Sequence, residues 1–298
     1  YLKGDETQSH GTGALNVGIA VAYGWWDITR DLKLTAGKGA QDVFSPYEPT
    51  TSMGYDGVSK CIGVGYGNVS SRYQNGLALA YKLSDTLKIN LALLESRLTD
   101  PNNTSYTSMN PGLKPNAPGA YVDNTTLLPK IEASGELTFG KMTLIPNAMW
   151  LRQTFDNIAE GADDTIVAWG LGLSARVIFG KLTIKGELQK GQNWYNASKT
   201  AVATPYPFKS EYIGPLAFAM SAKADARGKL YDSDNLSFWG QATYRIGRFL
   251  PTVIYGQMLI KRDIPGQEAD IRTQMYGVNC PIILNRHFYL IPEVMIYD

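Results

Sequence analysis

The side chains best suited to acid–base or nucleophilic chemistry are few in this sequence. It contains two histidines, His10 and His287, and the first lies near Asp5, Glu6 and Ser9. A Ser–His lipase or a His/Asp protease needs a histidine beside a nucleophile or an activated water. His287 falls at a predicted tight turn and His10 in an N-terminal loop region, so neither forms a strong constellation. We therefore expect that the protein is not an enzyme.

Metal and cofactor chemistry has equally little support. The acidic pairs Asp163–Asp164 and Asp232/Asp234 offer oxygen ligands of the kind that Ca²⁺ binds, but a solvated polar loop is the simpler interpretation. The two cysteines form no CxxC metal motif, and the CxxCH motif of haem attachment is absent. We expect no metal and no cofactor.

Charged side chains form a third group, which occupies alternate positions of long segments whose other positions are apolar. Residues 130–139, 168–179 and 182–189 show this pattern. A period of two is typical of a β-strand. Charges of both signs are costly in lipid but cheap in a water-filled lumen. We therefore predict that these residues line a pore: Lys82, Lys88, Lys130, Glu132, Glu136, Arg176, Lys185, Glu187, Arg245 and Glu293.

Composition narrows the class of protein that these segments build. The 298 residues carry a net charge of +1, from 28 basic and 27 acidic side chains, so there is no electrostatic footprint for nucleic acid. No run of about 20 apolar residues is present, so no transmembrane helix is expected. A transmembrane β-barrel remains, because its lipid-facing and lumen-facing residues alternate and cancel in average hydropathy.

The same alternation recurs along the whole chain and predicts about twelve strands in six hairpins. Alternating segments cover 15–25, 76–83, 87–93, 130–139, 168–179, 182–189, 236–245, 276–282 and 288–297. Three segments, 32–38, 142–154 and 249–261, are weaker, and the faces of the last two cannot be assigned. Several segments reach the 9–11 residues that a tilted membrane strand needs.

The connections alternate between tight and long. Tight turns fall near 29–31, 84–86, 140–141, 180–181, 247–248 and 285–286, and long loops at 39–71, 97–124, 155–165, 191–233 and 262–270. Outer-membrane barrels have this asymmetry, with short periplasmic turns and long extracellular loops. We predict a single all-β domain over 1–298, an antiparallel up-and-down transmembrane β-barrel. A soluble β-sandwich is the alternative.

Both ends of the chain fall on the predicted loop side. Closing an even-stranded barrel would then need one more strand at each end. We therefore expect that the sequence is trimmed at both ends, and that the complete barrel has 14 to 16 strands.

Aromatic residues occupy the strand positions that alternate with the charged ones, and they gather near strand ends. Amphipathic rings favour the headgroup level of a membrane. We predict interface positions for Tyr23, Trp25, Tyr81, Phe139, Trp169, Phe179, Tyr244 and Phe288. Ordinary surface or subunit-contact packing is the alternative.

The hairpin sequences resemble those of Gram-negative outer-membrane porins. The resemblance lies in VIFGKLTIKGELQKG (177–191), ELTFGKMTLIP (136–146), YRIGRFLP (244–251), ITRDLKLTAGKG (28–39) and GVGYGNVSSRYQNGLALAYKL (63–83). It implies an outer-membrane location, contact with lipid and lipopolysaccharide, a homotrimer of water-filled channels, and a long loop folded inward. The chain departs from the porin pattern at its last residue, Asp298, where porins usually end on Phe or Trp.

The expected function is passive diffusion of ions and small hydrophilic solutes, with weak anion preference at most. The alternatives are a substrate-selective uptake channel, a barrel that sheathes an electron-transfer cytochrome, and a non-conducting adhesin or structural barrel. Two loops are long enough to constrict the pore: 39–71, which contains DVFSPYEP (42–49), and 191–233, which contains IGPLAFAM (213–220). The sequence does not choose between them.

Overall fold

The computed structural model describes most of the predicted strands and part of the connections between them. The described residues are 3–7, 16–38, 43–50, 67, 69, 74–95, 123–125, 128–156, 160–161, 163–194, 196–197, 220, 222–224, 229–263, 269–285 and 288–298. Most of the predicted long loops, together with His10, Cys61 and His287, lie outside them.

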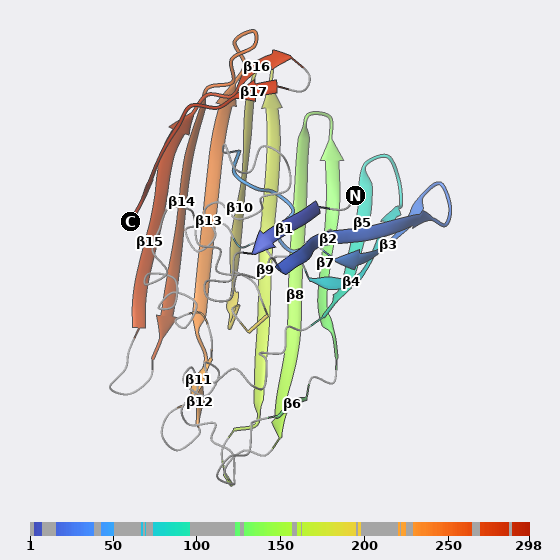
Figure 1. Ribbon diagram of the computed structural model, residues 1–298, viewed down its shortest axis with the longest axis vertical. Coiled ribbons are helices and arrows are strands. Elements are labelled where there is room, and N and C mark those ends of the chain that lie inside the picture. Colours follow the sequence, from blue (N-terminus) through green and yellow to red (C-terminus); the bar gives the residue numbers. More distant parts are fainter. Residues whose placement is uncertain are drawn as a thin grey trace.

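A single large antiparallel sheet dominates the structure (Figure 1). Its strands follow one another in chain order: β1 (Lys3–Thr7), β2 (Asn16–Asp27), β3 (Leu32–Lys38), β4 (Asn75–Lys82), β5 (Leu87–Leu94), β7 (Lys130–Phe139), β8 (Met142–Asp156), β9 (Thr165–Phe179), β10 (Leu182–Gln192), β13 (Asp234–Tyr244), β14 (Thr252–Arg262), β15 (Ala269–Asn279) and β18 (Glu293–Tyr297). The short β6 (Asp123–Thr125) pairs with β8. Two small hairpins, β11 (Lys223–Ala224) with β12 (Leu230–Tyr231) and β16 (Ile282–Asn285) with β17 (Phe288–Leu290), complete the described strands. This order confirms the predicted all-β, up-and-down architecture.

The central strands are long enough to cross a bilayer. β8 and β9 have 15 residues each, and β10, β13, β14 and β15 have 11 each. A tilted membrane strand needs about 9–11 residues. None of the described residues forms a helix long and apolar enough to span a membrane.

Three hairpins of the main sheet are closed by a glycine followed by a basic residue. The glycines Gly140, Gly180 and Gly247 have φ angles of 58°, 57° and 59°. Glycine tolerates this left-handed conformation because it lacks a Cβ atom. A glycine with positive φ at the first central position is typical of type II′ turns, whose twist matches the flanking strands. The tight turns predicted at these three places are confirmed.

The structure also corrects and completes the predicted strands. The weak segments 32–38, 142–154 and 249–261 correspond to the regular strands β3, β8 and β14, whereas β1, β6, β11, β12 and most of β16 were not predicted. The predicted strand 288–297 is wrong as a single element. It divides at Pro292, which lacks the N–H that a sheet ladder needs, so that β17 pairs with β16 and β18 pairs with β15.

The outermost strands of the main sheet are β1 and β18. In the part of the chain that the structure describes, no pairing joins these two edges. Barrel closure, the complete strand number and the extent of the domain therefore stay predictions.

Candidate channel lumen

One face of the main sheet carries nine of the ten predicted pore-lining residues. Partners in an antiparallel register share a face. Lys88 pairs with Glu136, and Glu187 pairs with Ser174. Following such pairs from strand to strand shows which residues share one face of the sheet. The same inner face carries Lys82, Lys88, Lys130, Glu132, Glu136, Arg176, Lys185, Glu187 and Glu293. Arg245 lies just after β13, in the turn to β14.

The first long loop runs across this inner face. Its described residues 43–50, here called the inner segment, contact side chains of β7, β10, β13 and β15. The segment begins with buried Val43 and Phe44 and contains Pro46 and Pro49. Its partners lie 88 to 229 residues away along the chain. Tertiary contacts with the wall therefore position the segment.

Glu187 of β10 is the centre of this attachment. Its carboxylate accepts hydrogen bonds from the Ser45 hydroxyl at 2.6 Å and from the Tyr47 backbone N–H at 2.8 Å. On the wall side it accepts the Ser174 hydroxyl at 2.9 Å and the indole N–H of Trp239 at 3.3 Å. A buried carboxylate is tolerated only when hydrogen bonds satisfy it. Glu187 therefore joins the inner segment to β9, β10 and β13.

A buried ion pair holds the start of the inner segment. Glu132 accepts the backbone N–H groups of Val43 and Phe44, each at 3.0 Å. The Lys130 ammonium lies 2.9 Å from the Glu132 carboxylate, and both side chains are fully buried. Lys130 also donates to the side chain of Gln74. The pair neutralises charges that would otherwise be costly beneath the loop.

Polar side chains hold the other end of the inner segment. Lys185 donates to the Glu48 carbonyl at 2.6 Å. Gln241 accepts the Thr50 N–H at 2.7 Å and donates to the Thr50 hydroxyl at 3.0 Å. Asn279 donates to the Thr50 carbonyl at 2.6 Å. Both ends and the middle of the segment are therefore attached to the wall.

The second long loop packs against the first. Trp194 and Met220, both from the predicted loop 191–233, join Phe44 in one buried apolar cluster. The rings of Phe44 and Trp194 meet edge to face, with centroids 6.3 Å apart. Lys130 donates to the Ala197 carbonyl at 3.2 Å. Both candidate loops thus reach the inner face, and the inner segment of the first makes the extended contact with the wall.

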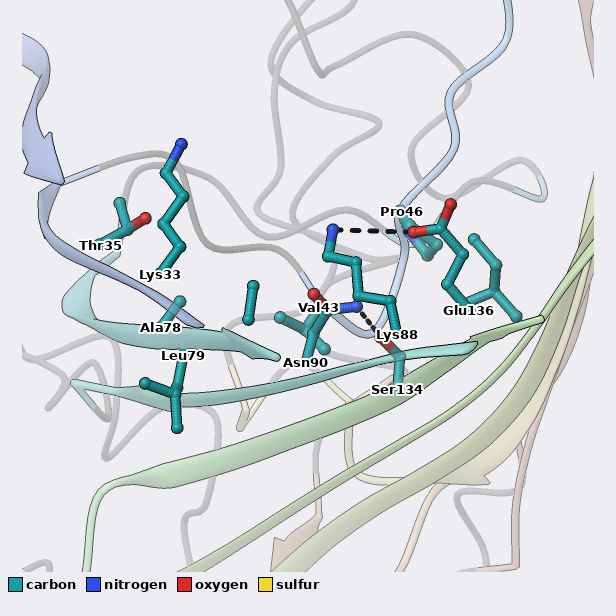
Figure 2. Close-up of a pocket in the computed structure, with 12 residues that line it drawn as sticks. Lys33, Thr35, Val43, Pro46, Ala78, Leu79, Lys88, Asn90, Ser134 and Glu136 are labelled. Carbon is teal, nitrogen blue, oxygen red and sulfur yellow. Dashed lines mark hydrogen bonds and ion pairs between the residues drawn. The ribbon is translucent and has the colours of Figure 1, made fainter. Parts of the chain in front are cut away.

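Beside the inner segment lies a cavity of about 310 Å³ (Figure 2). Its wall includes Lys88 with Glu136, whose charged atoms are 3.7 Å apart, and Asn90, which donates to Ser134 at 3.2 Å. Small residues of β4 form another part of the wall, and Lys33 extends toward the same space in Figure 2. The full lining is Lys33, Thr35, Val43, Pro46, Ala78, Leu79, Ala80, Lys88, Asn90, Ser134, Glu136 and Ile145. This polar space is the best candidate for an aqueous path.

The opposite face of the sheet is apolar and exposed. It presents Leu77, Leu91, Leu93, Leu171, Leu173, Leu188, Val253 and Val278. Soluble monomeric proteins rarely expose large apolar side chains over a whole face of a sheet. A lipid environment accounts for it, because hydrocarbon solvates such side chains.

The predicted interface aromatics divide into three groups. Tyr81, Phe139, Phe179 and Tyr244 are exposed on the outer face, and Trp169 is half-buried there, donating to Gln192 at 2.8 Å. Phe288 is exposed, but it lies in the small hairpin β16–β17, outside the main sheet. Membrane contact by these residues stays a prediction.

The outward placement of Tyr23 and Trp25 is wrong. Trp25 pairs with Thr35 and Tyr23 pairs with Gly37, which puts both rings on the inner face. The Lys33 ammonium lies 5.1 Å from the centroid of the Trp25 ring. The alternation in β2 shows that the strand has two different faces. It does not show which face contacts lipid, because the inner face also carries large aromatic side chains.

The acidic pairs have structural partners. Asp163 accepts the Leu230 N–H at 2.7 Å, Asp232 accepts from the Asn193 amide at 2.7 Å, and Asp234 accepts from Gln192 at 2.8 Å. Within the described ranges, no three His, Cys, Asp or Glu side chains are grouped to hold a metal ion. The expectations of no metal, no cofactor and no catalysis stay predictions.

Sequence reasoning missed the neutral side chains that attach the inner segment. Ser174, Gln189, Gln241 and Asn279 all lie on the inner face and bind the segment or Glu187. Their signal was present, since they occupy the same parity as the charged residues. The prediction of pore-lining residues rests on charged side chains alone and therefore omits them.

No protein-family model and no curated protein sequence matches the chain, but solved structures do. The outer membrane channel DcaP of Acinetobacter baumannii is similar at a TM-score of 0.65 and 12% identity, over 99% of this chain and 72% of that one. OmpT, an outer membrane protein of Vibrio cholerae solved in a trimer form, is similar at a TM-score of 0.54 and 11% identity, over 96% of this chain and 72% of that one.

These similarities establish the fold. The chain has the porin-like antiparallel β-sheet of bacterial outer-membrane barrels, as predicted. Both neighbours are bacterial outer-membrane proteins, and the predicted outer-membrane location agrees with them.

Proposed function

We propose that this protein is an outer-membrane channel for passive diffusion of ions and small hydrophilic solutes. The observation that carries the proposal is the two-faced sheet: an exposed apolar face on one side and a charged, hydrogen-bonded face on the other. Such a sheet, once closed, satisfies its backbone in lipid and encloses a polar lumen.

The proposed mechanism has no chemical step, so the protein is not an enzyme and uses no cofactor. Solutes pass beside the inner segment, which narrows the lumen and sets the size limit. Lys33, Lys88 and Glu136 replace part of the hydration of a passing solute with fixed charges. The many hydrogen bonds of the inner segment keep this constriction in one geometry.

The alternatives differ in what they require of the lumen. A sheath for a cytochrome needs room for a protein, whereas here the inner segment and the Phe44–Trp194 contact occupy part of the interior. A substrate-selective uptake channel is the second candidate. It is favoured by the cationic groups of the cavity, one of which, Lys33, also contacts the Trp25 ring outside the cavity lining.

The proposal also covers the oligomeric state of the protein. We propose a homotrimer whose outer face contacts membrane lipid and lipopolysaccharide. The trimer form of the Vibrio cholerae neighbour supports this assembly.

Conductance of the natural, full-length protein in a planar bilayer tests the proposal. We expect discrete, ohmic single-channel steps, and a salt gradient would then give the ion preference from the reversal potential. Absence of steps from protein shown to be folded and inserted would refute the diffusion channel. A saturable current with one solute only would favour the selective uptake channel.

A further inference from the structure

Three hairpins repeat one arrangement at the short-turn end of the sheet. Each type II′ turn has glycine first and a cation second, giving Lys141, Lys181 and Arg248. In each turn the carbonyl of that cationic residue accepts a backbone N–H from the next element: Ile178 at 3.0 Å, Arg245 at 2.9 Å and Ile283 at 2.9 Å, respectively. The three turns therefore lie in a row, with their backbones about 10 Å apart because two strand spacings separate them.

Exposed apolar side chains border this row on the lipid-facing side. Phe139, Phe179 and Phe249 each lie one residue from the turn and are exposed. The small hairpin β16–β17 continues this border with Leu284, Phe288 and Leu290, all exposed. The border is continuous with the apolar outer face through Tyr244 and Val253. The cations thus lie where an apolar belt ends and polar surroundings begin.

The three turns contain no acidic residue that would offset the positive charge of the row. Residues 139–142, 179–182 and 244–251 contain no Asp or Glu, and they add a fourth cation, Arg245. The neighbouring turn carries Asp85, which Lys82 binds at 2.6 Å. This hydrogen bond from Lys82 holds the pKa of the Asp85 carboxyl below its usual value, so the acid and its partner cancel. The local field is therefore positive.

We propose that Lys141, Lys181 and Arg248 bind the phosphates of anionic phospholipids in the leaflet that the short turns reach. Basic side chains beside an apolar surface place their stems along it and their charged heads at the headgroup level. Cations near an anionic leaflet gain electrostatic attraction for each charge. The short turns of outer-membrane barrels are periplasmic, so this is the phospholipid leaflet. The proposal requires membrane insertion and is independent of conduction.

Native mass spectrometry of the full-length protein, released from bilayer discs of equal phosphatidylglycerol and phosphatidylcholine, tests the surface. The unsubstituted protein should retain phosphatidylglycerol preferentially. The triple variant Lys141→Gln, Lys181→Gln, Arg248→Gln should lose that preference by about tenfold or more. Arg245 is left in place because its guanidinium donates to the Gly247 carbonyl at 3.4 Å and supports the turn.

A matched triple variant controls for the loss of three positive charges. Arg152→Gln, Lys190→Gln and Lys261→Gln remove three exposed cations near the loop ends of β8, β10 and β14. This control should keep the preference. Equal losses in the two triples, or no preference in the unsubstituted protein, would overturn the proposal. Bilayer conductance, measured in parallel, distinguishes a failure of this surface from a failure of the channel.

Discussion

Replacing Glu187 with glutamine should detach part of the inner segment and widen the proposed channel. The Glu187 carboxylate holds the segment through the Ser45 hydroxyl and the Tyr47 backbone N–H, at 2.6 and 2.8 Å. Glutamine keeps the size of the side chain but has one acceptor oxygen in place of two. Its amide nitrogen must then face either the Tyr47 backbone N–H or the Trp239 indole N–H, and neither group can accept a hydrogen bond.

The free-energy cost of the Glu187→Gln substitution follows from the hydrogen bonds that are lost. A hydrogen bond to a charged group contributes about 1.5–3 kcal/mol net. Losing one such bond and weakening the other should cost about 2–4 kcal/mol of attachment free energy. Glu187 is 4% exposed, so solvent does not screen the effect. Such a loss shifts the ratio of attached to detached segment by at least tenfold.

Single-channel recording gives the assay. The Glu187→Gln variant should show a larger conductance, more frequent transitions between levels and a higher size limit for neutral solutes. Glu136→Gln is the control, because it removes a glutamate of the same inner face that pairs with Lys88. The control should alter ion preference and leave the size limit unchanged. If the Glu187→Gln variant keeps the conductance and size limit of the unsubstituted protein, the inner segment is not the constriction.

Three further predictions concern folding, each measured by urea unfolding in lipid vesicles. Lys130→Met leaves the buried Glu132 without its ammonium partner and should lower the unfolding free energy by about 3–5 kcal/mol. Gly180→Ala forces a Cβ atom into φ 57° and should cost about 1–2 kcal/mol. Leu173→Arg, in the apolar belt, should cost about 2–4 kcal/mol, whereas Phe179→Arg at the end of β9 should cost at most about 1 kcal/mol. Equal costs for the two arginine variants would contradict a lipid-facing belt.

The strands were predictable because one physical rule fixes them. A sheet between lipid and water must alternate, and the period of two appears directly in segments such as 168–179 and 182–189. The turns were predictable for a similar reason, because Gly140 and Gly180 supply a conformation that other residues adopt at a cost. Both signals are local, so a single sequence contains them.

The inner segment was not predictable in detail because its contacts are not local. Glu132 meets Val43 across 89 residues, and Asn279 meets Thr50 across 229. Such pairs leave no periodic trace. The prediction of which face of β2 points outward failed for another reason. Its large residues, including Trp25, lie on the inner face, and only the pairing of Trp25 with Thr35 shows this placement.

The attachment of the inner segment changes what the charges of the inner face do. Lys130, Glu132 and Glu187 are buried: the two glutamates accept hydrogen bonds from the segment, and Lys130 pairs with Glu132. A charge covered in this way contacts no passing ion. A sum over all ten predicted pore-lining residues therefore does not give the ion preference of the proposed channel.

The remaining exposed charges decide that preference. Lys33, Lys88 and Glu136 border the open cavity, and Lys88 and Glu136 lie 3.7 Å apart, so that their fields largely cancel beyond the pair. Lys33 is then the cation with the greatest influence on a solute in the cavity. Its side chain is exposed, and its ammonium lies 5.1 Å from the centroid of the Trp25 ring in a cation–π contact. For a solute in this cavity the selectivity therefore depends on Lys33 of β3, and exposed Arg176 of β9 adds a second inner-face cation outside the cavity lining.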